Sequence, residues 1–267
     1  MREVIKTKYL ILLATATLLV FMCFRVPPPK SFKSETYRVY STQVKDSFDI
    51  QLHEHFTGYG SLSLLSTYYI LDSEIDNRTD RLHDSLLAMD SSLNFRIIGI
   101  GQTHFSKLLR KRDFVPPADG KFLSKGAMYS GNADEFYDFI LEDIIPEYDP
   151  FSDNRILIGH SFGGLFGVYT STQEDCPFDK IHALSPSLWV NYSDAKSTYE
   201  KDTSIHIHTN LDIHYGSLER LNKVANAAEE FGSVLRPTDK EKVSLNKVDW
   251  ATHMSILEKI YTFDLWF

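Results

Sequence analysis

Cysteine is scarce in this chain, with two residues among 267. Cys23 lies in an apolar run near the start, which leaves Cys176 alone in the rest of the sequence. No disulfide can therefore form within that larger part, and no CxxC pair or other metal-type cysteine spacing occurs. We expect Cys176 to be a small buried or half-buried side chain.

An excess of positive charge is also missing. The chain has 28 Lys and Arg residues against 36 Asp and Glu residues, which gives a net charge of −8. Nucleic-acid-binding proteins normally carry a basic patch or stripe, so this balance argues against a nucleic-acid partner. Internal repeats and low-complexity tracts are absent too. The remaining composition, 43% hydrophobic and 24% charged, is ordinary for one globular domain.

One hydrophobic run stands apart at the start of the chain. Residues 9–24 carry no charge; they follow the basic residues Arg2, Lys6 and Lys8 and end at Arg25 before a short proline run. A basic flank followed by an apolar stretch is typical of an export signal or a short membrane anchor. The chain is therefore expected to contact a membrane through this segment.

This segment sets the expected location and domain boundaries. We predict that residues 1–25 are an uncleaved signal anchor rather than a cleaved signal peptide, since no clear A-x-A cleavage site closes the run. The positive flank would keep the N-terminus cytoplasmic and place the rest in the periplasm or outside the cell, with secretion as the alternative after cleavage. Residues 26–35, rich in proline and serine, are predicted to be a linker, and residues 36–267 one domain.

Beyond the linker, strand and helix patterns alternate to the end of the chain. The expected strands cover 37–40, 48–52, 67–71, 95–100, 156–158, 180–184, 204–208 and 243–245, and the expected helices cover 136–144, 218–230 and 255–267. Strands that alternate with helices predict an α/β fold with a mostly parallel sheet and helices on both faces. The segment 102–131 has little regular pattern, and a loop of that length is usually functional.

The most informative stretch is Gly-His-Ser-Phe-Gly-Gly over 159–164, between an apolar strand and an apolar helix. Gly-x-Ser-x-Gly in that context is typical of a nucleophile elbow, where the serine sits on a sharp, strained turn and Gly159 and Gly163 keep bulky side chains away. Ser161 is thus the candidate nucleophile. The amide of Phe162, at the helix start, is a candidate donor to an oxyanion. A glycine-rich turn that contains a serine by chance is the alternative.

Such a serine needs a base and normally an acid that follow it in the chain. His253 lies just after the last predicted strand and before the terminal helix, and we predict it to be the general base, with His214 as its rival. Asp212 follows the predicted strand 204–208 and is the predicted acid that orients the imidazole. Asp249 is its rival, and a Ser–His pair without an acid is the third possibility.

The surroundings of the serine give further candidates. The second oxyanion donor is expected from the loop after strand 95–100, as the amide of Gly101 or Gln102. Trp189 and the segment 102–131 are expected to shape the substrate pocket, with core packing as the other role for Trp189.

Two further groups of side chains, a histidine pair and a basic triplet, could bind a metal ion or an anionic substrate. His206 and His208 alternate on one predicted strand face, but no acidic or cysteine ligands lie near them in the sequence, so no metal site is expected. Arg110, Lys111 and Arg112 either favour an anionic substrate or form an exposed basic turn.

Several stretches together resemble the esterase D and enterochelin esterase family of α/β-hydrolases. They cover residues 68–72, 98–101, 112–116, 131–146, 155–165 and 184–189. The resemblance extends over about 36–267 and implies an α/β-hydrolase fold, a serine esterase that forms an acyl-enzyme, no cofactor or metal, and a small-molecule ester such as a siderophore as substrate.

The sequence also departs from the family pattern. Val115 stands in place of a threonine, Asn132 in place of a glycine, and the segment around His253 reads Trp-Ala-Thr-His-Met-Ser. Some members of the family work with serine and histidine only, which leaves the role of Asp212 open. An acyltransferase of the same fold and a catalytically silent, membrane-tethered binding protein are the alternative functions.

Overall fold

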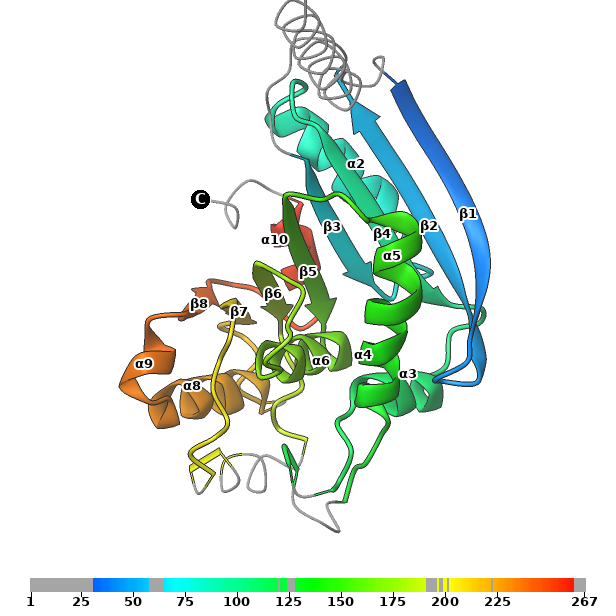
Figure 1. The fold of residues 1–267 in the computed structure, drawn as a ribbon. Helices are drawn as coiled ribbons and strands as arrows, with labels where there is room; N and C mark the ends of the chain where they lie inside the picture. Colours follow the sequence, from blue (N-terminus) through cyan, green and yellow to red (C-terminus); the bar gives the residue numbers. More distant parts are fainter. Residues whose placement is uncertain are drawn as a thin grey trace, which may run out of the picture.

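A computed structural model describes residues 31–57, 65–119, 121–123, 128–190, 196, 199–200, 202–221 and 223–261. One eight-stranded sheet runs through this part, with helices on both sides (Figure 1). The strands are β1 (Ser31–Ser41), β2 (Asp46–Phe56), β3 (Ser66–Leu71), β4 (Phe95–Gln102), β5 (Asn154–His160), β6 (Lys180–Leu184), β7 (Asn210–Gly216) and β8 (Val243–Val248). The helices are α2 (Arg78–Met89), α3 (Lys107–Phe114), α4 (Ala133–Phe139), the π-helix η1 (Ile140–Ile144), α5 (Ile145–Tyr148), α6 (Phe162–Ser171), α8 (Val224–Val234), α9 (Pro237–Lys240) and α10 (Ile256–Ile260).

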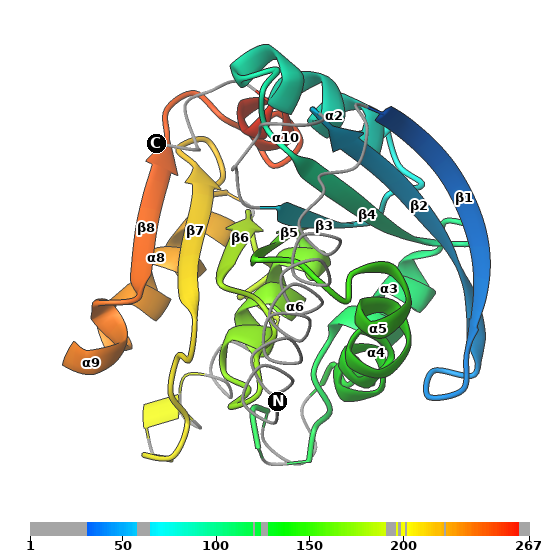
Figure 2. The ribbon, with the colours of Figure 1, turned by 45° about the horizontal axis from the view of Figure 1, so that its top comes forward.

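The strand order across the sheet is β1-β2-β4-β3-β5-β6-β7-β8, which Figure 2 shows from one edge to the other. β1 and β2 form an antiparallel hairpin, and β2 also pairs antiparallel with β4. All other neighbours are parallel. The prediction of a mostly parallel sheet is thus confirmed. Parallel strands end at the same edge, so the loops after β3, β5, β6, β7 and β8 lie along one side of the molecule.

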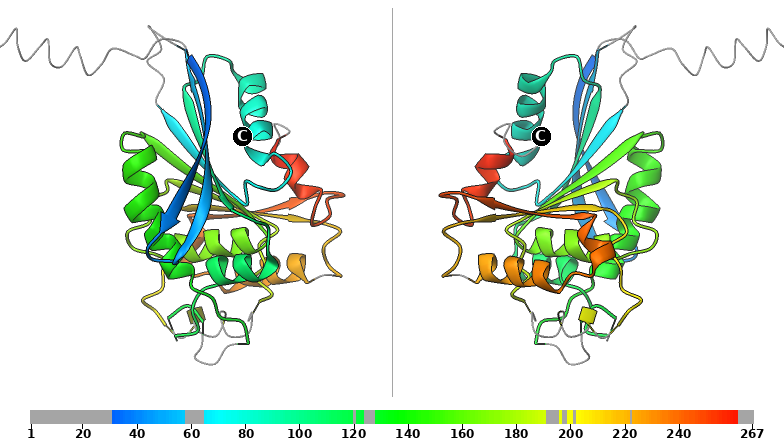
Figure 3. Two further views of the ribbon diagram at one scale, coloured as in Figure 1. Left: turned by 90° about the vertical axis from the view of Figure 1, so that its right-hand side faces the viewer. Right: turned by 90° about the vertical axis from the view of Figure 1, so that its left-hand side faces the viewer.

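Helices cover the sheet on both faces, as Figure 3 shows, with α2 and α10 on one side and α4, α6 and α8 on the other. Neighbouring residues of β5 illustrate why the middle of a central strand is apolar on both faces. Leu157 belongs to the core on the α6 side, whereas Ile158 belongs to the core on the α2 and α10 side. Both side chains are almost fully buried, and each such burial contributes about 1.5–3 kcal/mol to the free energy of unfolding.

The predicted strands over 67–71, 95–100, 156–158, 180–184 and 243–245 are confirmed as β3, β4, β5, β6 and β8, some of them longer than expected. The predicted hairpin is β1 and β2. These strands carry continuous or alternating apolar runs, and those patterns identify them reliably.

The predicted strand over 204–208 is wrong. In that segment the amide of Ile207 donates to Asp239 Oδ1 at 3.2 Å, and its carbonyl accepts from Lys242 Nζ at 3.0 Å. Side chains therefore satisfy the backbone of Ile207, and the amide of His208 donates to the carbonyl oxygen of Ser171 in α6 instead of to a neighbouring strand. The isoleucines and histidines of this segment nevertheless alternate as in a strand. The strand that pairs with β6 is β7, which begins two residues later.

Other boundaries differ from the expectation. β1 begins at Ser31, so residues 31–35 of the predicted linker belong to a strand. The irregular segment 102–131 contains the helix α3. The predicted helix over 218–230 begins instead with α8 at Val224, and the tail helix within 255–267 is the short α10, since residues 262–267 lie outside the described part.

The predicted signal anchor, residues 1–25, also lies outside the described residues. In the part of the chain that the structure describes, no helix has the length and apolar character to cross a bilayer. Export of the chain and attachment to a membrane therefore stay predictions from the sequence.

Candidate active site

Ser161 occupies the sharp turn between β5 and α6. Its backbone has φ 60° and ψ −113°, a positive φ that a residue with a side chain rarely adopts. The turn closes so tightly that a Cβ on Gly159 would lie 2.2 Å from the carbonyl oxygen of Gly163. Only glycine fits there. The sequence therefore forms the strained strand-to-helix turn that its glycine pattern predicts.

His253 faces this serine. Its Nε2 lies 3.1 Å from Ser161 Oγ, a distance at which the hydroxyl donates a hydrogen bond to the ring. His253 lies in the loop between β8 and α10, and its side chain is 30% exposed. A base in hydrogen-bond contact with a serine hydroxyl can remove its proton during attack on a substrate.

The neighbouring histidine of the elbow fixes the His253 loop. His160 Nε2 donates to the carbonyl oxygen of His253 at 2.6 Å, and the two rings lie 4.6 Å apart. Burial lowers the pKa of His160 to about 3, with the nearby His253 as a further cause, so the ring is neutral at neutral pH. His160 thus holds the backbone of the His253 loop through this hydrogen bond.

Glu219 completes a chain of hydrogen bonds. Its Oε1 accepts from His253 Nδ1 at 2.8 Å, and its side chain is fully buried. Oε2 accepts from Ser185 Oγ at 2.7 Å and from the amide of Gly216 at 2.6 Å. Both oxygens are therefore occupied, and the carboxylate fixes the imidazole with its Nε2 lone pair toward Ser161.

The structure thus brings Glu219, and not the expected Asp212, to His253. The expectation placed Asp212 in a loop after strand 204–208, but the strand is β7, and Asp212 lies within it. Its Oδ2 is 2.8 Å from Lys180 Nζ. The loop after β7 is where a carboxylate can reach the histidine, and Glu219 lies there. The rival Asp249 is exposed, and the ring nitrogen that an acid would bind is bonded to Glu219.

A sequence signal for Glu219 did exist. Leu211, Ile213 and Tyr215 alternate with polar residues up to Gly216, and this marks a strand whose following turn contains Glu219. Gly216 lets the loop that carries His253 come close to the end of β7, because a Cβ on Gly216 would lie 2.1 Å from the carbonyl oxygen of Ala251.

Of the predicted oxyanion donors, Phe162 lies next to the serine, whereas Gly101 and Gln102 lie on a strand that is not adjacent to β5. Phe162 is the first residue of α6, a position whose amide has no acceptor within its own helix. Gly101 and Gln102, by contrast, belong to β4, which is separated from β5 by β3. The side chain of Gln102 donates to Asp113 Oδ2 at 2.8 Å, and its amide faces the carboxylate of Glu74.

The loop after β3 lies closer to the elbow than the loop after β4. β3 pairs directly with β5, and a Cβ on Gly163 would be 3.4 Å from Leu71 and 3.6 Å from Asp72. The residues that follow Leu71 are therefore better placed than Gly101 and Gln102 to supply the second oxyanion donor.

Asp72 is held in place by arginines. Arg110 donates from Nε to Asp72 Oδ1 at 2.6 Å and from a second nitrogen to Oδ2 at 2.9 Å, while Arg78 approaches Oδ2 to 3.4 Å. Arg110 also donates to the carbonyl oxygen of His160 at 3.2 Å. Arg110 is buried, so it supports the elbow from within and is not part of an exposed basic turn.

A residue of the segment 184–189 contacts the serine hydroxyl. Ser187 Oγ lies 3.1 Å from Ser161 Oγ and can donate to it. Trp189 is 37% exposed, and the centroid of its ring lies 6.4 Å from that of Tyr129. Trp189 is therefore not fully buried in the core, and its role in a substrate pocket stays a prediction.

Comparisons with known proteins point to esterases. The chain is 35% identical over 94 residues to the siderophore enterobactin esterase of Emericella nidulans, a match that spans 31% of this chain and 31% of that protein. The chain thus matches about a third of that relative. No protein-family model matches the chain.

Two solved structures illustrate the likeness in fold. The siderophore hydrolase EstB from Aspergillus nidulans has a TM-score of 0.68 at 20% identity, over 86% of this chain and 93% of that one. The BES protein from Bacillus cereus has a TM-score of 0.66 at 23% identity, over 85% of this chain and 92% of that one. This chain therefore has an α/β-hydrolase-like fold, which it shares with both of these proteins over most of each chain.

Proposed function

We propose that this protein is a serine hydrolase of carboxylic esters. The observation that carries the proposal is the unbroken chain of hydrogen bonds from Ser161 through His253 to Glu219, built on a strained elbow. The same three roles in the order nucleophile, acid, histidine are found in α/β-hydrolases.

The reaction proceeds in two steps. Ser161 Oγ attacks the ester carbonyl carbon while its proton passes to His253 Nε2, and the carbonyl oxygen becomes an oxyanion. The C–O bond to the alcohol then breaks, and the leaving alkoxide takes the proton from His253. Water repeats the sequence on the acyl-enzyme, which releases the carboxylic acid and restores the serine.

Glu219 acts on the histidine rather than on the substrate. Its carboxylate keeps the Nδ1 proton in place and stabilises the positive charge that His253 gains during attack. It takes the role that the sequence assigned to Asp212. The amide of Phe162 and one amide from residues 72–74 are proposed to hold the oxyanion.

For the substrate, we propose a siderophore-type ester. The support is the relation to the enterobactin esterase and to EstB, which is partial in sequence and extensive in fold. A cyclic trilactone offers several ester bonds to one nucleophile, and no metal is needed for their hydrolysis by this arrangement.

The test compares the parent with Ser161→Ala on p-nitrophenyl acetate, p-nitrophenyl butyrate and enterobactin. The proposal predicts turnover of at least one ester by the parent and a loss of about 10³-fold or more in the variant. Variant activity equal to the parent's would refute the serine mechanism. Turnover of the simple esters without cleavage of enterobactin would refute only the substrate class.

A further inference from the structure

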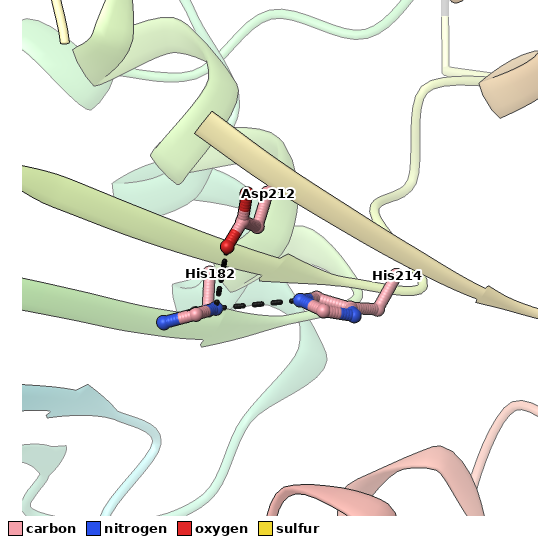
Figure 4. A group of neighbouring side chains, drawn as sticks. All are labelled: His182, Asp212 and His214. Atoms are coloured by element: carbon pink, nitrogen blue, oxygen red, sulfur yellow. Dashed lines mark hydrogen bonds and ion pairs between the residues drawn. The ribbon is translucent and has the colours of Figure 1, made fainter. Parts of the chain in front are cut away.

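Three potential metal ligands that are not part of the candidate active site lie close together on the neighbouring strands β6 and β7. His182 of β6 pairs in register with Asp212 of β7, and His214 follows Asp212 two residues later. Residues two apart on a strand point to the same face, so all three side chains share one surface of the sheet. Figure 4 shows the carboxylate and the second imidazole both directed at the Nδ1 side of His182.

The distances suit a single small cation. His182 Nδ1 lies 3.3 Å from His214 Nε2 and 3.6 Å from Asp212 Oδ2. All three ligand atoms fall within 4.8 Å of one another. Neighbouring ligands of a tetrahedral zinc ion, with Zn–N bonds of about 2.0–2.1 Å, lie roughly 3.3–3.4 Å apart. The two imidazole nitrogens already have this spacing, and Asp212 would have to move toward them to complete three corners of a tetrahedron.

The donor set fits as well. Two imidazoles and one carboxylate are ligand types that zinc takes in proteins. His182 and His214 are each 2% exposed, so bulk water has little access to the two nitrogen ligands.

We propose that His182, Asp212 and His214 bind one divalent transition-metal ion of the zinc class, with water in the remaining position. Imidazole and carboxylate ligands from adjacent strands form a three-ligand zinc site of the kind that keeps one position open. The ion links β6 to β7.

Such a link would support β7, the strand that precedes the loop with the proposed acid Glu219. The carbonyl of His214 accepts from the amide of Ser185 at 2.7 Å, and the hydroxyl of Ser185 donates to Glu219. β7 ends at Gly216, whose amide donates to the same carboxylate. The ion is therefore structural in this proposal, and it stabilises the folded protein by mass action.

Lys180 competes with the ion. Its Nζ lies 2.8 Å from Asp212 Oδ2, the oxygen closest to His182. The side chain of Lys180 is 38% exposed, so it can turn into solvent at small cost. Without an ion, His182 is hydrogen-bonded to His214 and Asp212 is paired with Lys180, and this arrangement is the alternative that the experiment must separate.

The experiment uses the full chain after treatment with a chelator. Zinc binding is titrated against a chromophoric chelator, and cobalt(II) is added separately to record its visible d–d absorption, which is strong for four-coordinate sites. The variants are His214→Gln, His182→Gln and Lys180→Gln. The matched control is the double variant His206→Gln and His208→Gln, which removes two histidines that are less buried than His182 and His214.

The proposal predicts one zinc ion per chain and a raised Tm in the parent and in the control. Each of the two ligand variants should bind zinc at least about 100-fold more weakly and lose the four-coordinate cobalt spectrum. Lys180→Gln should bind about fivefold more tightly, because the competing ammonium is gone. Circular dichroism verifies that each variant is folded.

Three results would overturn the proposal. They are no binding at one equivalent by the parent, equal binding by parent and folded ligand variants, and loss of binding in the control instead. Because no readout depends on ester turnover, the outcome is independent of the proposed esterase function.

Discussion

Glu219 is buried, and each of its carboxylate oxygens has a partner. Oε1 accepts from His253, while Oε2 accepts from Ser185 and from the amide of Gly216. A charged group in such a place holds its orientation, because rotation would break bonds that no water replaces. The position of the His253 ring therefore depends on this one side chain.

Replacement of Glu219 by glutamine tests that dependence. Glutamine keeps the shape but offers an NH₂ group or a neutral oxygen to Nδ1, so the ring loses its fixed tautomer and the stabilisation of its positive charge. We expect kcat to fall by about 10³-fold or more, with little change in KM. Steady-state kinetics on a p-nitrophenyl ester measure the effect.

The control for this variant is Asp249→Asn, which alters an exposed carboxylate four residues before His253. Its kcat should stay within about threefold of the parent's. If Glu219→Gln turned over as fast as Asp249→Asn, the acid would have to be another residue, or the site would work as a Ser–His pair.

Glu74 is a second carboxyl under constraint near the catalytic edge. Burial raises its pKa to about 7, although the amides of Glu74 and Gln102 partly offset that effect, and the neighbouring Asp72 adds to it. Between its ordinary pKa of 4.5 and about 7, the folded protein thus binds a proton that the unfolded chain lacks. Stability must therefore decrease as the pH rises through this window.

Glu74→Gln removes the titration and keeps the shape. Relative to the parent, the variant should gain stability as the pH rises from about 5 to about 8, by about 1–2 kcal/mol, since the carboxyl keeps part of its hydration. Urea denaturation at both pH values gives the two differences. A stability difference that is the same at both would show that Glu74 ionises normally.

Among single residues, the sequence predicts those members of the candidate site that a motif or the strand order marks. Ser161 and Phe162 belong to the elbow motif, and His253 follows the last strand. Glu219 was missed because the alternation at 204–208 resembles a strand. The loop that follows the strand was therefore expected around Asp212, although the strand itself is Asn210–Gly216. Side-chain contacts from Asp239 and Lys242 decide that region, and local periodicity does not report them.

At the scale of elements, the β5–α6 elbow shows which glycines are required. A Cβ at Gly159 would overlap the Gly163 carbonyl at 2.2 Å, whereas a Cβ at Gly163 would make only ordinary contacts, the nearest at 3.4 Å from Leu71. The motif alone predicts that both glycines are needed to avoid a steric clash. The structure shows that Gly159 is needed for this reason and that Gly163 is not.

Gly159→Ala should therefore destabilise the protein by more than about 3 kcal/mol, because the carbonyl it meets is backbone and cannot move aside. Gly163→Ala should stay within about 1 kcal/mol of the parent or exceed it, since alanine favours the helix. Urea midpoints of the two variants, compared side by side, check this. Equal losses would mean that the elbow is looser than described.

Elements with continuous apolar runs were predictable, and those built from tertiary contacts were not. β3, β5 and β6 have both faces buried over most of their length, so each contains a run or cluster of apolar residues. The start of β1 at Ser31 is set by pairing with Phe56 across the hairpin, and a proline- and serine-rich stretch gives no sign of that.

At the scale of the whole molecule, the sheet order assembles the site. Ser161, Glu219 and His253 follow β5, β7 and β8, three strands that are parallel and end at one edge. Residues as far apart as 92 positions in sequence therefore meet. The same order explains why the loop after β3, adjacent to β5, replaces the loop after β4 as the neighbour of the elbow.

The opposite edge of the sheet is built for stability. Asp149 is fully buried and accepts from Thr67 at 2.8 Å, Tyr69 at 2.9 Å and Arg155 at 2.8 Å, with Arg96 at 3.2 Å. This network joins the end of α5 to three strands, where a buried carboxylate with several partners fixes one arrangement. Chemistry and anchoring thus occupy different ends of the same strands.

The central claim is that Ser161 is a nucleophile activated by His253. The most direct measurement is intact-protein and peptide mass spectrometry after reaction with a fluorophosphonate. The account predicts a single phosphonyl adduct on Ser161, formed by the parent and reduced at least about 100-fold in rate in His253→Ala. A protein that stays unmodified, or that reacts equally fast without His253, would contradict it.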